Sequence, residues 1–338
     1  MEPLVHEGLG RLLELHGRRT PLALGADSGT KLLPEKALGD GGALKLGRRK
    51  LPLPPQPLGR DTTQAPFLAL SDDVAVLDGA ASHDPRQLLA ALRATREEAG
   101  WRRLLYTPAV EPAEMPLLAY LGVDLFDSLA AELRGAAGFR LEQGDWIPDG
   151  GATAAGNRKA LAGWLSRIRS ALEQGRLREM VERTALHNPR VAQLLHHSRN
   201  LLATRGVRRT VEIRAGALSL GHPAVIEWRR NLERFAPPAA GMVLLLLPCS
   251  ARKPYHWSAT HRRFHRTLRE LDNWLALHVV SVTSPLGLVP RELEMLHPAA
   301  HYDVGVTGHW DANETAMFGR QLERLRPEDR NKKAIVHA

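Results

Sequence analysis

A run of six consecutive apolar residues, Met242 to Leu247, restricts the fold of this 338-residue chain more than any other feature. Such a run is typical of a strand buried on both faces, as at the centre of a parallel sheet. Further strand patterns follow at His278–Thr283, Tyr302–Thr307 and Lys333–His337, and helical patterns lie between them at Ser258–Leu275, from Pro290, and at Ala312–Leu325. The alternation predicts a C-terminal three-layer α/β domain with a mostly parallel sheet.

The preceding half of the chain contains shorter units of the same kind. Strand patterns occur at Phe67–Leu70, Val74–Gly79, Arg102–Val110 and Gly122–Ser128. Helical patterns occur at Asp84–Ala99, for which Asp84 is the expected N-cap, and at Pro116–Leu121, Asn157–Leu177, Arg178–Ala185 and Asn188–Ala203. The segment from Lys31 to Arg60 is rich in glycine and proline, so we expect a long loop there. We expect a domain boundary near residues 205–240 and assign residues 1–205 and 206–338 to two α/β domains.

Charge and cysteine content narrow the class of protein. Lysine and arginine exceed aspartate and glutamate by 46 to 37, which favours a polyanionic partner, although a basic surface without function is the alternative. The single cysteine, Cys249, excludes an intramolecular disulfide and a cysteine-based zinc cluster within this chain. No apolar run is long enough to span a bilayer and no secretory signal is evident, so we expect a cytoplasmic protein.

The segment that follows the apolar run carries most of the reactive side chains. Between Pro248 and His261 it places the Cys249 thiol, the Lys253 ammonium and the Tyr255 phenol in one connection. A thiol is nucleophilic as the thiolate, which nearby cations favour, so Cys249 is a candidate nucleophile. An inert buried thiol is the alternative.

Two more polar segments lie at the ends of predicted strands. Thr283–Glu294 has small residues at a turn, where backbone can approach a planar ligand, and His297–Asp311 supplies imidazoles and carboxylates. None of these matches a standard metal-ligand motif, so we expect no metal site.

These three ordered segments resemble the archaeosine synthase family, which is paralogous to tRNA-guanine transglycosylase. The family pattern PC-x3-KPY-x2-S-x2-H is met in full from Pro248 to His261, and the stretches TSPLGLVPRELE and HYDVGVTGHWD match as well. The N-terminal half is similar more loosely to the transglycosylase barrel, through Arg18–Leu24 and Gly122–Ser128. This likeness implies a degenerate or shortened (β/α) barrel and places Asp127 at the transglycosylase nucleophile. The zinc cysteines of the transglycosylase are missing, because Cys249 is the single cysteine of this chain. The DSGG base-binding loop is not recognised either, because Asp27–Gly29 comes too early.

The resemblance implies a reaction and a set of site residues. The family adds an amine, L-lysine, to the nitrile of 7-cyano-7-deazaguanine in the tRNA D-arm, a step of archaeosine biosynthesis. We therefore expect catalytic roles for Cys249, Lys253, Ser258, His261 and Asp303. The expected substrate-binding residues are Tyr255, Ser284, Pro285, Gly287, Arg291, Glu294, His301, Thr307, His309 and Asp127.

The resemblance also implies partners. No cofactor is expected besides lysine as cosubstrate, and the implied partners are tRNA, a separate PUA-domain chain, a radical-SAM enzyme and, as one alternative, a second copy of the chain. Arg262, Arg263 and Arg266 lie on a basic helix beside the reactive segment and are candidate tRNA backbone contacts, with a merely solvated helix as the alternative. Two other functions remain open: a non-catalytic tRNA-binding subunit, and a base-exchange enzyme that uses Asp127.

Overall fold

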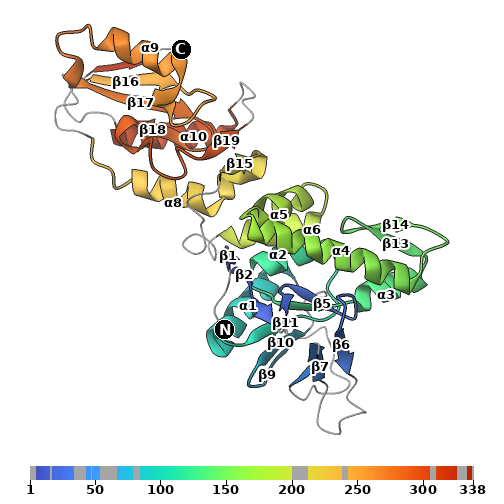
Figure 1. Cartoon of the computed structure of the whole chain (residues 1–338). Coiled ribbons are helices and arrows are strands. Elements are labelled where there is room, and N and C mark those ends of the chain that lie inside the picture. Colours follow the sequence, from blue (N-terminus) through green and yellow to red (C-terminus); the bar gives the residue numbers. More distant parts are fainter. Residues whose placement is uncertain are drawn as a thin grey trace. The chain divides into compact units, whose positions relative to one another are not determined.

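The computed structural model describes residues 5–15, 17–33, 43–46, 48–53, 67–78, 84–199, 212–237, 243–304, 310–325 and 333–336 (Figure 1). The chain divides into two compact units, Met1–Gly206 and Val207–Ala338. Both units contain helices packed on mostly parallel sheets, which confirms the predicted mixed α/β class. No helix in the described part of the chain is long and apolar enough to cross a membrane.

The N-terminal unit is built on a five-stranded sheet. Its strands, in spatial order, are β5 (Leu22–Leu24), β12 (Leu125–Asp127), β11 (Leu104–Tyr106), β10 (Val74–Asp78) and β9 (Phe67–Leu70). The first four are mutually parallel and β9 is antiparallel. Among the described residues the two edge strands, β5 and β9, do not pair with each other.

Helices and a hairpin complete the N-terminal unit. The helices are α1 (Pro85–Ala99), α2 (Met115–Tyr120), α3 (Leu129–Ala136), α4 (Ala154–Glu173), α5 (Leu177–Ala185) and α6 (Pro189–His197). As predicted, Asp84 caps α1, because its carboxylate accepts hydrogen bonds from the backbone amides of Arg86 and Gln87. The hairpin of β13 (Phe139–Glu142) and β14 (Asp145–Pro148) was not predicted.

Strands replace part of the loop that was predicted for residues 31–60. β6 (Thr30–Leu33), β7 (Ala43–Leu46) and β8 (Arg49–Pro52) form an antiparallel sheet. Leu44 and Leu46 are fully buried while Lys45 between them is exposed, which is the period-two pattern of a half-buried strand. The loop prediction was wrong for these residues because the weight given to glycine and proline concealed that alternation.

A buried ion cluster links three segments of the N-terminal unit. The Asp124 carboxylate, 1% exposed, accepts hydrogen bonds from Arg11 Nε at 2.8 Å and from Arg96 Nη2 at 2.9 Å. The amide of Leu105 also donates to it at 2.8 Å. Because a buried carboxylate is costly unless it is paired and hydrogen-bonded, these donors make Asp124 part of the framework.

The C-terminal unit is built around the apolar run. β16 (Val243–Pro248) pairs in parallel with β17 (Leu277–Thr283) and β20 (Lys333–Val336), and β18 (Gly287–Pro290) pairs antiparallel with β17. On one face Leu244 and Leu246 share an apolar cluster with Leu325 of α10 (Ala312–Leu325). Leu247 lies on the other face, toward α9 (Ala259–Leu268). Strand β16 is thus covered by helices on both faces, as its continuous apolar sequence requires.

Four elements of the C-terminal unit differ from the sequence expectations. The helix predicted to reach Leu275 ends at Leu268, and the helix predicted from Pro290 is a single 3-10 turn, Arg291–Leu293. β19 (Tyr302–Val304) pairs with β15 (Ile213–Ala215) rather than with the main sheet, and α8 (Pro223–Leu232) was not predicted.

Candidate active site around Cys249

The connection from β16 to α9 brings the first motif into one compact turn. β16 ends at Pro248, and a 3-10 turn, Tyr255–Trp257, leads into α9. The Ser258 hydroxyl accepts a hydrogen bond from the amide of His261 at 3.1 Å, which caps the first turn of α9. Ser258 therefore has a structural role, because it fixes the start of α9 and with it the position of His261 in the first turn.

His261 is buried and held in one tautomer. Its Nε2 lies 2.9 Å from the carbonyl oxygen of Pro248, and because a carbonyl only accepts, Nε2 carries the hydrogen. The lone pair is then on Nδ1, which is buried without a hydrogen-bond partner among the described residues. Burial lowers the pKa of His261, so the ring is neutral near pH 7.

A buried pair of tyrosines joins all three motif segments. The hydroxyl of Tyr302, on β19, hydrogen-bonds to the hydroxyl of Tyr255 and lies 2.5 Å from the hydroxyl oxygen of Thr283, at the end of β17. Tyr255 also stacks on His261, with ring centroids 5.4 Å apart. Burial raises the pKa of Tyr302 to about 12 and raises that of Tyr255, so both phenols remain protonated.

Lys253 and Cys249 lie beside this tyrosine pair. Lys253 Nζ is 4.3 Å from the centroid of the Tyr302 ring, within the range of a cation–π contact. Burial lowers the pKa of Lys253, while the nearby Asp303, Cys249 and Glu212 oppose that shift. Cys249 packs against the apolar cluster that includes both tyrosines and remains partly exposed, so its sulfur is not sealed inside the core.

Glu294 joins the first and second motif segments. It is 3% exposed, and one carboxylate oxygen lies 2.7 Å from Nδ1 of His256 and 3.2 Å from Nε of Arg291. Its second oxygen, Oε2, is buried without a hydrogen-bond partner in the described part of the chain. Glu294 and Arg291 thus form one ion pair, with the Glu294 carboxylate facing the interior.

Side chains of α8 and α10 hold the turn of the second motif. Gln321 of α10 accepts a hydrogen bond from the Leu288 amide at 2.8 Å and donates one to the Leu286 carbonyl at 3.1 Å. Gly287 between them has φ +84°, and a Cβ there would lie 2.0 Å from Gln321 Oε1. Only glycine therefore fits this position without a shift.

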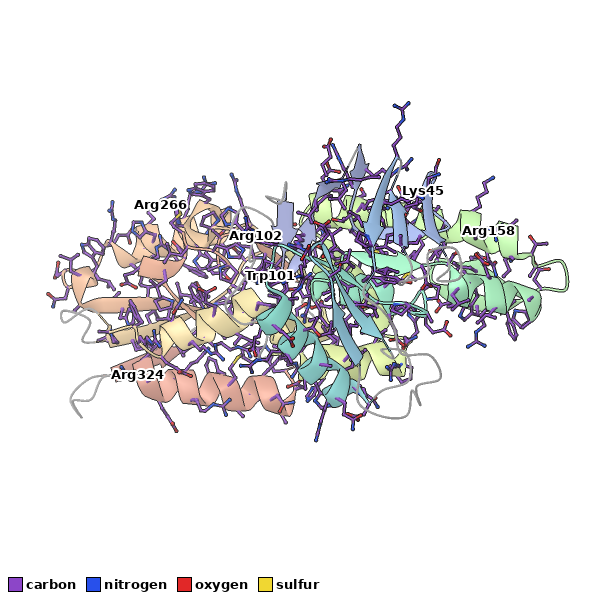
Figure 2. All side chains as sticks on the ribbon, turned by 90° about the horizontal axis from the view of Figure 1, so that it is seen from below. Lys45, Trp101, Arg102, Arg158, Arg266 and Arg324 are labelled. Atoms are coloured by element: carbon purple, nitrogen blue, oxygen red, sulfur yellow. The ribbon has the colours of Figure 1, made fainter. Side chains whose placement is uncertain are left out.

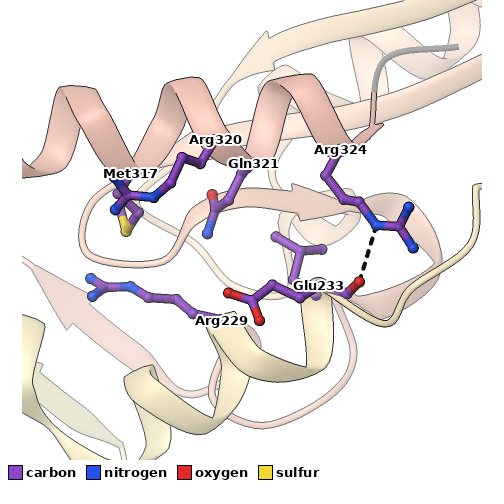
Figure 3. A pocket seen from close by; sticks show the side chains of 7 residues that line it. Arg229, Glu233, Met317, Arg320, Gln321 and Arg324 are labelled. Atoms are coloured by element: carbon purple, nitrogen blue, oxygen red, sulfur yellow. Dashed lines mark hydrogen bonds between the residues drawn. The ribbon is translucent and has the colours of Figure 1, made fainter. Parts of the chain in front are cut away.

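Ser284 and Pro285 are held by the same two helices. The Ser284 hydroxyl donates to the Glu314 carboxylate, and Arg229 Nη2 donates to the Pro285 carbonyl at 2.9 Å. Figure 3 shows Arg229 and Gln321 in the pocket of about 110 Å3 between α8 and α10, with Arg324 bonded to the carbonyl of Glu233. The turn is thus held by α8 and α10, and Thr283, the residue before it, contacts Tyr302 of the motif cluster.

A second cavity of about 250 Å3 borders the motif cluster under α9. Its walls are mainly apolar and include Leu247, Phe264 and Leu277. His261 and Arg291 also line it. The cavity is large enough for a small organic group, since an apolar cavity of about 150 Å3 holds benzene.

The exposed side of α9 carries the predicted RNA-contacting residues. Arg262, Arg263 and Arg266 are all exposed, and Arg266 is labelled in Figure 2. They lie on the same helix as the buried His261, so the basic surface and the motif cluster share one element.

Other predicted residues lie apart from this cluster or outside the described residues. His301 is exposed on the surface near His297, with ring centroids 6.1 Å apart. Asp303 is exposed but close enough to Lys253 to influence its pKa. Thr307 and His309 lie outside the described residues.

Asp127 belongs to the N-terminal unit and is saturated with hydrogen bonds. It is 5% exposed and accepts from the Tyr106 hydroxyl at 2.7 Å and from the amides of Ala109 and Leu129. Burial raises its pKa in spite of these donors. The carboxylate thus holds the end of β12 to its neighbours.

Sequence reasoning missed Tyr302 and Thr283 as members of the cluster. Both lie within the matched stretches, so the signal was present in their position next to Asp303 and Ser284. Their hydroxyl groups meet only through the fold, because Tyr302 is separated from Tyr255 by 47 residues.

The C-terminal unit matches a family model described as a domain of unknown function, DUF5591, over residues 225–338. Over 98% of its length the chain is 31% identical to the archaeosine synthase subunit alpha of Methanosarcina acetivorans, and it covers 57% of that protein. It is 32% identical to the archaeosine synthase of Haloferax volcanii over 69% of this chain and 44% of that protein. It is 34% identical to the archaeosine synthase subunit alpha of Thermococcus kodakarensis over 72% of this chain and 44% of that protein. The chain spans about half the length of these curated relatives.

Proposed function

This chain belongs to the archaeosine synthase family, and from that premise we propose that it adds an amine to the nitrile of 7-cyano-7-deazaguanine in tRNA. The observation that carries the proposal is the contact of Lys253 with Tyr302 next to a partly exposed Cys249. The three motif segments meet there, and the reactive groups remain accessible. The amine is L-lysine in this proposal, and no cofactor takes part.

The chemistry divides a difficult addition into two easier steps. The Cys249 thiolate adds to the nitrile carbon, a carbon–sulfur bond forms, and the nitrile nitrogen takes up a proton to give a thioimidate. The amine nitrogen then attacks the same carbon, the thiolate leaves, and a proton lost from the amine completes an amidine. Thiolate is regenerated, so the net reaction joins one amine to one nitrile.

The surrounding residues support these steps. The positive charge of Lys253 stabilises negative charge on the sulfur during the addition, and His261, neutral near pH 7, or Asp303 exchanges the protons. Ser258 positions His261 through the helix cap. The base lies against Tyr255 and the Ser284–Gly287 turn, with Arg291 and Glu294 near it. Substrate contacts of His301, Thr307 and His309 stay predictions from the sequence.

The basic side of α9 contacts the tRNA backbone in this proposal. Arg262, Arg263 and Arg266 are exposed on the helix that also carries His261, so phosphate contacts there bring the modified base toward the motif cluster. The base must leave its stack to reach Cys249.

The N-terminal unit and the partners complete the proposal. We infer that residues 1–205 form a degenerate transglycosylase-like barrel, of which the five-stranded sheet is the core, and that residues 206–338 form a three-layer catalytic domain. The names of two relatives contain the word subunit, which supports a further chain in the complex. A PUA-domain protein, a radical-SAM enzyme that processes the amidine, and a second copy of this chain are the partners we propose. A cytoplasmic location remains a prediction.

The decisive experiment incubates the chain with tRNA that carries the cyano base and with L-lysine, followed by mass spectrometry of the nucleosides. We expect a lysine adduct, and ammonia and glutamine serve as comparison donors. Tight tRNA binding without any adduct would instead support a non-catalytic binding subunit. Release of the free base, abolished by Asp127→Asn, would support base exchange.

A further inference from the structure

We infer that Tyr302 is a positioning residue whose ring holds the Lys253 ammonium beside the sulfur of Cys249. The inference rests on the proposed function, which gives that sulfur its chemical role. It adds a residue from a different segment, 49 positions after Lys253 along the chain.

The first support is the placement of the ammonium over the ring. Lys253 Nζ lies 4.3 Å from the centroid of Tyr302, and a cation within about 6 Å of an aromatic face is attracted by the ring quadrupole. Lysine has a long flexible side chain, so a fixed aromatic surface restricts where its charge can lie.

The second support is that the ring itself is fixed. The Tyr302 hydroxyl is bonded to Tyr255, in the connection after β16, and to Thr283, at the end of β17. Tyr302 is 3% exposed. A ring anchored at its far end to two other motif segments and packed on its sides presents one face to Lys253.

The third support concerns the charges that compete for Lys253. Asp303 and Glu212 are both exposed carboxylates that act on Lys253, and Cys249 is the third acidic group that does so. With the ring removed, an extended lysine would be free to pair with either carboxylate in solvent. The ring therefore favours the arrangement in which the ammonium stays near the sulfur.

A direct acid–base role does not suit Tyr302. Burial raises its pKa to about 12, so the phenol stays protonated through the range in which a thiol ionises. Its contribution is therefore to geometry and to the electrostatic surroundings of Lys253.

The single cysteine of the chain permits a test that needs no tRNA. The rate of Cys249 alkylation by iodoacetamide is measured against pH in the full chain and in the variants Lys253→Met, Tyr302→Leu and Tyr302→Phe. Because only the thiolate reacts, the midpoint of this profile reports ionisation of the sulfur.

We expect Lys253→Met and Tyr302→Leu to raise the midpoint by similar amounts, about one pH unit, which is about tenfold slower alkylation well below the midpoint. Tyr302→Phe keeps the aromatic face and loses only the hydroxyl anchor, so its shift should be less than half of that. The double variant Lys253→Met with Tyr302→Leu should shift no further than Lys253→Met alone, because both changes remove the same effect.

Two results would overturn the inference. One is a Tyr302→Leu profile that matches the unmodified chain while Lys253→Met shifts; the other is a Lys253→Met profile that does not shift. If Tyr302→Leu fails to fold, Tyr302→Met replaces it, since it also removes the aromatic face, and a midpoint that does not rise with this variant counts against the inference. Failure of the proposed function is separable: a chain that forms no tRNA adduct but shows these shifts refutes the reaction and leaves the positioning role intact.

Discussion

Two polar clusters of this molecule differ in how their buried polar groups are hydrogen-bonded. Around Asp124 in the N-terminal unit, two arginines and one backbone amide donate to the carboxylate, so both of its oxygens are paired, while Nε of Arg96 is buried without a partner among the described residues. In the motif cluster of the C-terminal unit, buried Nδ1 of His261 and Oε2 of Glu294 have no hydrogen-bond partner among the described residues. Buried polar groups are nearly always paired in native proteins, so an unpaired one needs a separate explanation.

The difference indicates which cluster supports the fold and which supports chemistry. A carboxylate surrounded by donors gains stability and has no capacity left for a ligand. Buried groups without partners cost stability, and they are retained where a substrate, a proton or a water completes them. We therefore expect mutations in the Asp124 cluster to act on unfolding and mutations in the motif cluster to act on the reaction.

The largest expected effect is on the reaction. Cys249→Ala should reduce the initial rate of adduct formation by about 1000-fold or more, because the covalent step is lost. Its free energy of unfolding should change by less than about 1 kcal/mol, since the side chain is partly exposed. Ser250→Ala is the control and should retain the rate. A Cys249→Ala chain that forms the adduct at full rate removes the covalent mechanism and leaves the family assignment in place.

Asp124→Asn should show the opposite pattern. Removing the charge leaves Arg11 and Arg96 buried without their counterion, which should destabilise the N-terminal unit by about 3–5 kcal/mol in urea unfolding. The matched control is Glu97→Gln, which breaks the exposed Arg93–Glu97 pair and should leave the free energy of unfolding almost unchanged. Equal effects of the two changes would contradict the structural assignment of Asp124.

Glu114 tests whether every buried carboxylate in the N-terminal unit is as well compensated as Asp124. Burial raises its pKa to about 7, in spite of Arg190 at 2.9 Å. The folded chain then keeps a proton between about pH 4.5 and 7 that the unfolded chain releases, so stability falls as pH rises through this window, by up to about 3 kcal/mol. Glu114→Gln should flatten that dependence when unfolding is measured from pH 4.5 to 8. An unchanged slope would mean that Glu114 ionises normally in the folded chain.

Gly287 tests how strictly the turn beside the motif cluster is fixed. Gly287→Ala must accept a positive φ and a contact with Gln321, which should destabilise the C-terminal unit by about 1–3 kcal/mol. Gly319→Ala lies within α10, where a Cβ meets no atom within 4 Å, and should stabilise by about 0.5–1 kcal/mol. Thermal unfolding of both variants checks the opposite signs. A neutral Gly287→Ala would show that the turn adapts easily.

The smallest expected effect is on tRNA binding. Arg262→Glu with Arg263→Glu should weaken binding about tenfold near 0.1 M salt and reduce the salt dependence by up to about two counterions. Arg230→Glu with Arg234→Glu changes the net charge equally at exposed positions in and just after α8 and is the control. Filter binding at several salt concentrations distinguishes the pairs. Equal losses would indicate general charge attraction rather than an interface on α9.

The sequence predicted the parts of the fold that depend on local pattern. The apolar run predicted β16, and the alternating strand and helix patterns around it predicted β17, α10 and β20 close to their observed bounds. The Asp84 cap was also predicted, because capping depends on neighbouring residues. Such features need no knowledge of distant contacts.

The parts that failed depend on contacts between distant segments. Tyr302 lies within a matched stretch but was not predicted as a site residue, because its role arises from Tyr255 and Lys253, about 50 residues earlier in the chain. The pairing of β19 with β15 was equally inaccessible, since three-residue strands carry almost no periodicity. Ser258 was predicted as catalytic, and its observed bond to the His261 amide supplies a local reason for a serine there.

The length and register of β16 set the positions of Cys249 and His261. Pro248 is paired with Val282 at the last position of the ladder, and the carbonyl of Pro248 is the group that selects the tautomer of His261. Deleting one residue from β16 would invert its inward and outward side chains and displace the strand end by about 3.3 Å. The Cys249 sulfur would then be displaced, and the His261 imidazole would lose its hydrogen bond to the Pro248 carbonyl. We expect evolution to tolerate many substitutions within this strand but no change in its length.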